Sequence, residues 1–272
     1  MMRLALRTLR YRKSGFLATF VAVVFGTAIV MACGGLMETG IRSTVEPQRL
    51  AGADLVLTGK QSHLRPGAED ATPLPERVGV PVNLLPKIRA TQGVTSATGD
   101  YTFTAIAPAI TEGHNWSSAA LAPYRLSSGH APRSGQVVVS SGKVGERLTF
   151  LINGDPRTFT VSGLAAGPAG HAFFNDRDAA HLVRTPERFA DIGVQVAPGT
   201  DLDAVRKHLE EIGNLTVSAG IDRGLAEHPD AESHRTALIA IAGSFGGIAA
   251  MTMMFVVAST LALAAQHRER EF

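Results

Sequence analysis

Residues 14–37 of the chain read SGFLATFVAVVFGTAIVMACGGLM, and residues 237–265 read ALIAIAGSFGGIAAMTMMFVVASTLALAA. Neither stretch holds a charged side chain, and a helix of about 20 apolar residues can cross a bilayer. Both stretches are therefore predicted to be membrane spans. The second is longer than the hydrocarbon core requires, so it should tilt or continue outside the membrane as a helical stalk.

Three alternatives to a pair of spans remain open from the residues. The first stretch could be a cleaved signal peptide, or the signal of a lipoprotein with Cys33 as the lipidated residue. The apolar run continues past Cys33 to Met37, however, which favours a retained span. A buried helical hairpin of a soluble protein is the third alternative, but two uncharged runs of this length are rare there.

Charged residues beside the spans predict the orientation of the chain. Cationic residues precede the first span and follow the second, namely Arg3, Arg7, Arg10, Arg12 and Lys13, and then His267, Arg268 and Arg270. Cationic flanks stay in the cytoplasm, so both termini should be cytoplasmic and the segment between the spans extracytoplasmic. The tail 1–14 is amphipathic as a helix and either lies on the inner leaflet or only fixes topology.

The overall composition is rich in apolar residues and poor in charge. Of 272 residues, 45% are hydrophobic and 18% are charged, which excludes a disordered chain and is unusual for a soluble enzyme. The single cysteine excludes a disulfide framework and a cysteine-based zinc site. The formal charge of +2 reflects the basic tail, so it does not indicate a nucleic-acid partner.

The segment between the spans has the pattern of a mixed α/β domain. Strands are predicted at 53–58, directly after Gly93, and at 101–107, 136–140, 147–152, 157–164, 192–197 and 215–218, and helices are predicted at 84–90, 176–183 and 201–212. Asn153-Gly154-Asp155 is a favourable hairpin turn, and Asp176 and Asp201 are expected to cap their helices. Pro- and Gly-rich stretches at 66–86 and 163–170 are expected to be loops or hinges between two lobes.

No motif of enzymatic chemistry is recognised along the chain. It contains no GxSxG, HExxH, CxxC or calcium-loop pattern. Acidic and histidine side chains gather before the second span at Glu227, His228, Asp230, Glu232 and His234. A solvated base of the stalk is the preferred interpretation, because His228 and His234 diverge on a helix. The sequence thus predicts no catalytic, cofactor-binding or metal-binding residue, and it favours partial burial of Trp116 in packing.

Small residues recur at four-residue spacing in both spans. Ala18, Ala22 and Gly26 share a face of the first, and Gly243 and Gly247 form a GxxxG motif in the second. Small residues let helix backbones approach closely in lipid, so these five are candidates for packing against other membrane helices. General abundance of alanine and glycine explains the pattern equally well.

Several stretches are similar to one family of membrane proteins. They are GADLV at 52–56, YRLSSGHAP at 124–132 followed by GQVVVS at 135–140, VGERL at 144–148, and REREF at 268–272. With the order of tail, span, large outer domain and span, they resemble the MacB/FtsX-type permeases of ABC transporters. The chain departs from the family pattern at Gln136, where a glutamate is common.

The resemblance implies an α+β membrane protein with an extracytoplasmic domain of the MacB periplasmic-core type. The expected divisions are a basic tail at 1–14, spans at 15–37 and 237–265, the core domain at 38–236, and a cytoplasmic coupling segment starting at 266–272. Such permeases have at least four spans, so the chain is expected to be an N-terminal part of a permease or a truncated product.

The resemblance also implies a function and partners. The permease would couple ATP hydrolysis by a separate cytoplasmic ABC subunit to movement of the outer domain, for export or force transmission, without catalysing a reaction itself. Its candidate coupling residues are Arg268, Glu269, Arg270, Glu271 and Phe272. The expected partners are that ATPase, the lipid bilayer, and other permease spans or a second permease copy. A transmembrane sensor with a ligand-binding outer domain is the alternative.

Overall fold

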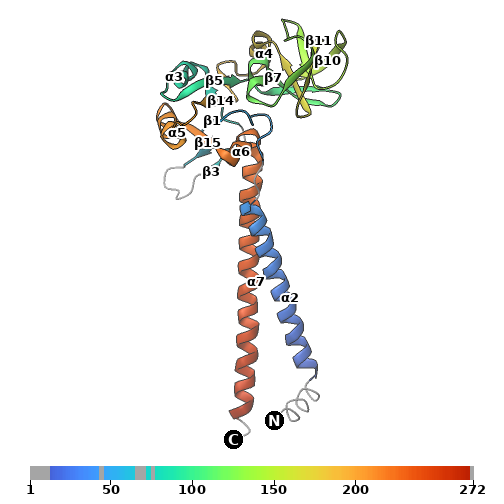
Figure 1. Ribbon diagram of the computed structural model, residues 1–272. Coiled ribbons are helices and arrows are strands. Elements are labelled where there is room, and N and C mark those ends of the chain that lie inside the picture. Colours follow the sequence, from blue (N-terminus) through green and yellow to red (C-terminus); the bar gives the residue numbers. More distant parts are fainter. Residues whose placement is uncertain (1–12, 43–45, 65–71, 75–76, 270–272) are drawn as a thin grey trace. The chain divides into compact units, whose positions relative to one another are not determined.

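The computed structural model describes residues 13–42, 46–64, 72–74 and 77–269 (Figure 1). The chain divides into two compact units. Met1–Ser43 and Glu232–Phe272 belong to one, which we call the helical unit, and Thr44–Ala231 form the other, which we call the mixed unit. Segments from the two ends of the sequence therefore fold together.

The helical unit is built from α2 (Lys13–Arg42) and α7 (Pro229–Glu269). Large apolar side chains are exposed on both helices, including Phe25 and Met31 on α2 and Phe245, Met251 and Phe255 on α7. Water-soluble proteins rarely expose an apolar surface of this kind. In lipid such a surface is favourable, and a helix satisfies its backbone polar groups internally. Val23–Gly40 and Thr236–Ser259 are long and apolar enough to cross a membrane.

The helix α7 is much longer than a membrane span. Its 41 residues correspond to about 62 Å at 1.5 Å per residue, about twice the thickness of a hydrocarbon core. The helix begins at a proline, which is favourable in the first turn because its missing N–H has no intrahelical partner to lose. The helix α7 is therefore long enough to extend beyond the membrane without a break, as was expected for the second span.

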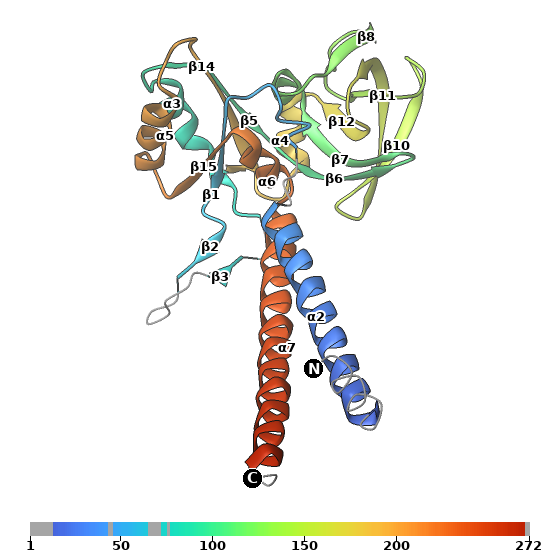
Figure 2. The ribbon, with the colours of Figure 1, turned by 60° about the horizontal axis from the view of Figure 1, so that its bottom comes forward.

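The mixed unit contains two main sheets, of which the first has four strands. Their order is β15 (Leu215–Ala219), β1 (Leu55–Gly59), β14 (Asp191–Val196) and β5 (Val94–Asp100), and all pairings are antiparallel. Apolar side chains of this sheet form a core with α3 (Leu85–Arg89) and α5 (Leu202–Glu211). Figure 2 shows α3 and α5 beside this sheet, and the strands of the second sheet on the other side of β5.

The second sheet is larger and closes on itself. Its order is β10 (Arg147–Ile152), β6 (Phe103–Ala107), β7 (Ile110–Asn115), β12 (Gly170–Phe174), β9 (Gln136–Val139), β11 (Asp155–Ala166) and β8 (Arg125–Gly129). Because β10 pairs with both β6 and β11, six of these strands form a small barrel to which β8 is added. Phe150, Phe159 and Phe174 pack edge to face in its core.

Short elements complete the mixed unit. They are the pairs β2 (Ser62–His63) with β3 (Thr72–Pro73) and β4 (Val80–Pro81) with β13 (Arg188–Phe189), the helices α4 (Asp176–Leu182) and α6 (Arg223–Glu227), and the 3-10 turns η1 (Val82–Leu84), η2 (Trp116–Leu121) and η3 (Gly220–Asp222). Trp116 is partly buried and packs edge-on against Phe173, as the sequence predicted.

Most predicted elements are present, with three corrections. The turn between β10 and β11 has the positive φ angles expected of Asn153 and Gly154. The cap of α4 is Asn175, whose side chain accepts from the N–H of Arg177, rather than Asp176. The expected loop at 163–170 is wrong in its first part, because β11 continues to Ala166. The strands β7, β8 and β12 were not predicted, because their polar and small residues interrupt the alternation of apolar and polar positions that indicates a strand.

The chain crosses between the two sheets twice, and both crossings adjoin paired aspartates. The first follows Asp100 at the end of β5, and the second returns to Asp191 at the start of β14. Asp100 and Asp191 are register partners in the antiparallel pairing of β5 with β14. The lobes are therefore joined here, and not at the stretches 66–86 and 163–170 where the sequence suggested hinges.

Candidate functional site

A buried arginine holds the two crossing points together. Arg49 is 4% exposed. Its Nη1 lies 3.0 Å from Oδ2 of Asp100, and its Nη2 donates to Oδ2 of Asp191 at 2.8 Å. Both aspartates are completely buried. A buried charge is tolerated only when it is paired, so the three side chains depend on one another.

Arg77 and Glu227 extend this network. One Nη atom of Arg77 donates to Oδ2 of Asp191 at 3.4 Å, and the other donates to the backbone carbonyl of Glu227 at 2.7 Å. The Glu227 carboxylate accepts the backbone N–H groups of Gln48, Arg49 and Leu50 at distances from 2.8 to 3.1 Å. Successive backbone N–H groups that point at one carboxylate form a concave anion-binding site and stabilise the negative charge.

These contacts join the two segments that connect the mixed unit to the helices. Gln48–Leu50 follow α2 in the chain, and Glu227 lies at the end of α6, two residues before α7 begins. The interpretation of Glu227 as part of a solvated stalk base is therefore wrong, because its side chain is buried and fully engaged. His228 is exposed, while the side chains of Asp230, Glu232 and His234 lie outside the described residues.

The electrostatics of Asp100 follow from its neighbours. Burial raises the pKa of a carboxyl group, but the charge of Arg49 and the contact with His114 outweigh that effect. The pKa of Asp100 is therefore held well below its usual range. Thr102 adds a hydrogen bond from its hydroxyl to Oδ2 of Asp100 at 2.6 Å.

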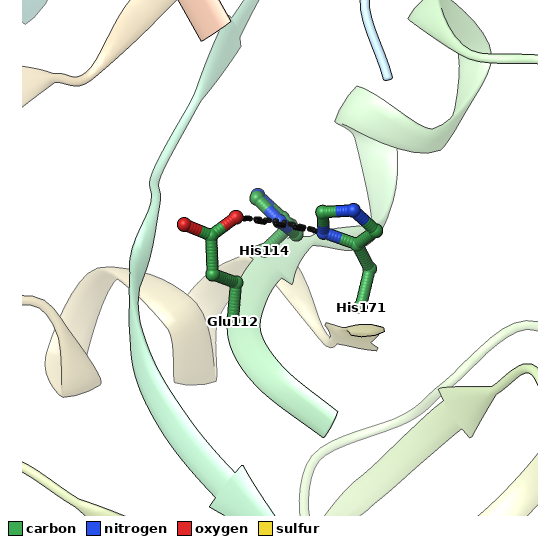
Figure 3. Close-up of side chains that lie close together, drawn as sticks. All are labelled: Glu112, His114 and His171. Atoms are coloured by element: carbon green, nitrogen blue, oxygen red, sulfur yellow. Dashed lines mark hydrogen bonds and ion pairs between the residues drawn. The ribbon is translucent and has the colours of Figure 1, made fainter. Parts of the chain in front are cut away.

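A second group of polar side chains adjoins Asp100 in the barrel. Nδ1 of His114 lies 3.2 Å from Oδ2 of Asp100, and its Nε2 lies 3.0 Å from Nδ1 of His171. Oε2 of Glu112 lies 3.8 Å from Nε2 of His114 and 3.6 Å from Nδ1 of His171. Figure 3 shows the three side chains directed toward one another. Among the described residues, this is the set whose geometry suits a metal ion.

Strand geometry explains why these three residues meet. Glu112 and His114 are two residues apart on β7, so their side chains lie on the same face. His171 on β12 is the register partner of Glu112 in the parallel pairing with β7. Burial and the neighbouring His114 lower the pKa of His171 to about 4, so its ring is neutral at pH 7.

Comparisons with known proteins identify the family. The profile of the MacB-like periplasmic core domain matches residues 16–212. The chain belongs to this family. No curated protein matches its sequence.

Solved structures similar to the MacB-like chain include two extracytoplasmic domains. One is the periplasmic region of MacB from Actinobacillus actinomycetemcomitans, with 11% identity, a TM-score of 0.46, and coverage of 62% of this chain and 91% of that one. Another is the extracellular domain of the noncanonic ABC-type transporter YknZ from Gram-positive bacteria, with 10% identity, a TM-score of 0.40, and coverage of 52% and 89%.

The family membership confirms the fold class and the resemblance predicted from the sequence. Two helices suited to a membrane flank a mixed α/β domain of the MacB periplasmic type. The chain is thus a membrane protein with an extracytoplasmic segment of the MacB-like periplasmic core type.

The structure describes only part of the candidate coupling segment. The backbone of Arg268 and Glu269 continues α7, but their side chains, and all of Arg270, Glu271 and Phe272, lie outside the described residues. The role of this segment stays a prediction.

The small residues of the spans lie in different surroundings. A Cβ atom added to Gly26 would lie 3.4 Å from side-chain atoms of Met253, so α2 and α7 are in contact there. Gly246 approaches Cys33 similarly, at 3.2 Å between Cβ positions. Gly243 and Gly247 have no described atom within 4 Å of an added Cβ. The side chains of Ala18 and Ala22 are not among those described.

Proposed function

We propose that the chain acts as a permease subunit of a MacB/FtsX-type ABC transporter, which passes movement from its membrane helices to its extracytoplasmic domain. The observation that carries this proposal is the junction formed by Arg49 and Glu227. It ties the segments next to α2 and α7 to both crossings between the sheets. The function is therefore mechanical coupling, and the ATP would be hydrolysed by a separate cytoplasmic subunit.

The junction is suited to transmit movement because it is costly to separate. Removing one partner of a buried ion pair costs about 3–5 kcal/mol. A displacement of the chain at Gln48–Leu50 or at Glu227 would thus move Asp100 and Asp191 with it. Asp100 ends β5 and Asp191 begins β14, at the two points where the chain passes between the sheets, so the displacement would reach both lobes.

The rest of the proposal concerns topology and partners. Both termini would be cytoplasmic, as the cationic flanks indicate, and the protein would be a multi-pass component of the plasma membrane. Gly243 and Gly247 offer an open helix surface on which further spans or a second permease copy could pack. Residues 268–272 would begin the segment that binds the ATPase, with Phe272 as apolar anchor and the alternating charges setting register.

The ATPase contact can be tested by co-purification from the native membrane. An affinity-tagged chain should retain an ABC ATP-binding subunit, identified by mass spectrometry. Truncation of a buried aromatic anchor costs about 2 kcal/mol or more, so Phe272→Ala should reduce the retained ATPase by about an order of magnitude or more. Glu269→Ala should reduce it less, because charges at the rim of an interface contribute little.

A second variant keeps this test decisive. Replacing Arg268, Glu269, Arg270 and Glu271 by glutamine removes the charges that would set register. If this variant and Phe272→Ala both retain the ATPase as well as the unmodified chain, the coupling role is wrong. Equal amounts of each variant in the membrane fraction serve as the control for insertion.

A further inference from the structure

Three potential ligand atoms converge in the barrel beside Asp100. The facing nitrogens of His114 and His171 and Oε2 of Glu112 are separated by 3.0, 3.6 and 3.8 Å. A tetrahedral ion with bonds of about 2.0–2.1 Å places neighbouring ligand atoms about 3.3 Å apart. The observed triangle therefore has the dimensions of one face of a tetrahedral metal site (Figure 3).

The surroundings of His114 fix the tautomer that such a site needs. Its ring is completely buried, and its Nδ1 faces Oδ2 of Asp100. The ionised carboxylate accepts a hydrogen bond from Nδ1–H, which leaves the lone pair of Nε2 directed at His171 and Glu112. Metal-binding histidines usually donate their other N–H to a carboxylate or carbonyl in this way. Asp100 is in turn held by Arg49 and Thr102.

We propose that Glu112, His114 and His171 bind a divalent transition-metal ion such as Zn²⁺. Two imidazoles and one carboxylate suit zinc and related ions, whereas Ca²⁺ and Mg²⁺ prefer sets made only of oxygen atoms. The side chain of Glu112 is 44% exposed and that of His171 is 18% exposed, so an ion can enter from solvent. Water or a side chain of a partner would complete the coordination.

This site goes beyond the proposed transport function and does not depend on it. The alternative for these residues is a hydrogen bond from one histidine to the other, with Glu112 in solvent. The two arrangements differ in their requirement for Glu112, because the hydrogen bond needs only the two rings. Glu112→Gln therefore distinguishes them, and its exposed position makes the change compatible with the fold.

Zinc binding should be measured by calorimetry on the full chain in detergent, without a histidine tag and after treatment with a chelator. We expect one high-affinity ion per chain, and no comparable heat with Mg²⁺. Glu112→Gln should weaken binding by about tenfold or more, and His171→Ala should abolish it. With excess zinc the thermal midpoint of the mixed unit should rise, because the ion binds only the folded state.

The matched control is His130→Ala. His130 is exposed on the same lobe, and Nδ1 of its ring lies 2.8 Å from the neighbouring carbonyl oxygen of Ala131. This variant should bind zinc as the unmodified chain does. Absence of zinc binding by the unmodified chain would overturn the proposal, and so would binding by either Glu112→Gln or His171→Ala that equals that of the unmodified chain.

Discussion

At the scale of single residues, Arg49 links parts of the sequence that are far apart. It lies close to the first helix in the chain, yet its guanidinium contacts aspartates about 50 and 140 residues later. An arginine is suited to this position because its planar group can satisfy two carboxylates at once and keeps its charge when buried. Its removal should therefore affect the whole mixed unit.

We expect Arg49→Met to lower the free energy of unfolding of the mixed unit by about 3–5 kcal/mol, since two buried carboxylates lose their partner. Urea unfolding of the full chain in detergent, followed by Trp116 fluorescence, measures this change, because Trp116 is the single tryptophan and packs inside the unit. Arg206→Ala breaks an exposed pair with Asp203 and should cost less than about 1 kcal/mol. Equal losses in the two variants would contradict a structural role for the network.

At the scale of elements, the contact between α2 and α7 depends on small residues. Cys33 on α2 faces Gly246 on α7, whereas Gly243, less than one helical turn away, is open. The face of α7 that meets α2 is thus the stripe of Ala242 and Gly246, next to the GxxxG motif of Gly243 and Gly247. Gly243 and Gly247 therefore remain available to pack against other helices, as the GxxxG spacing predicts.

This contact can be measured with the native cysteine. In Gly246→Cys the new Cβ would lie 3.2 Å from that of Cys33, close to the range of about 3.5–4.5 Å in disulfides. We expect oxidation of this variant in membranes to protect both thiols from maleimide labelling. In Gly243→Cys both thiols should stay reactive. If oxidation protects both variants to the same extent, α2 and α7 do not pack in this register.

In the molecule as a whole, the surface of one unit is suited to lipid and that of the other to water. The helical unit presents apolar side chains on its surface, and the mixed unit buries them in cores of its own. A membrane location for the first and an aqueous one for the second follow from these surfaces. The side of the membrane, however, depends on the charged flanks.

We expect a cysteine placed at Asp155 to be external and one placed at Met2 to be cytoplasmic. Asp155 follows the exposed hairpin turn of β10 and β11, so a thiol there is accessible without disturbing the barrel. In a Cys33→Ser background, an impermeant maleimide applied to intact spheroplasts should label Asp155→Cys at once and Met2→Cys only after lysis. Labelling in the reverse order would refute the proposed topology.

The membrane helices, most strands of the mixed unit and the family could all be predicted from the sequence. These features depend on local composition, because a span is a run of apolar residues and a hairpin such as β10–β11 is fixed by a turn of a few residues. The same local reasoning failed at β7 and β12. In β7 the polar residues His114 and Asn115 are buried and adjacent, and β12 ends in three consecutive buried residues, so the expected alternation of apolar and polar positions is missing.

Only the tertiary structure decided which charged residues act together. Glu112 and His114 share a strand face, but His171 reaches them through the parallel pairing of β7 with β12. Arg49 likewise contacts Asp191 and Glu227, each more than 100 residues away in the sequence. Such contacts are set by the pairing of distant strands, which hydropathy and spacing along the chain do not encode.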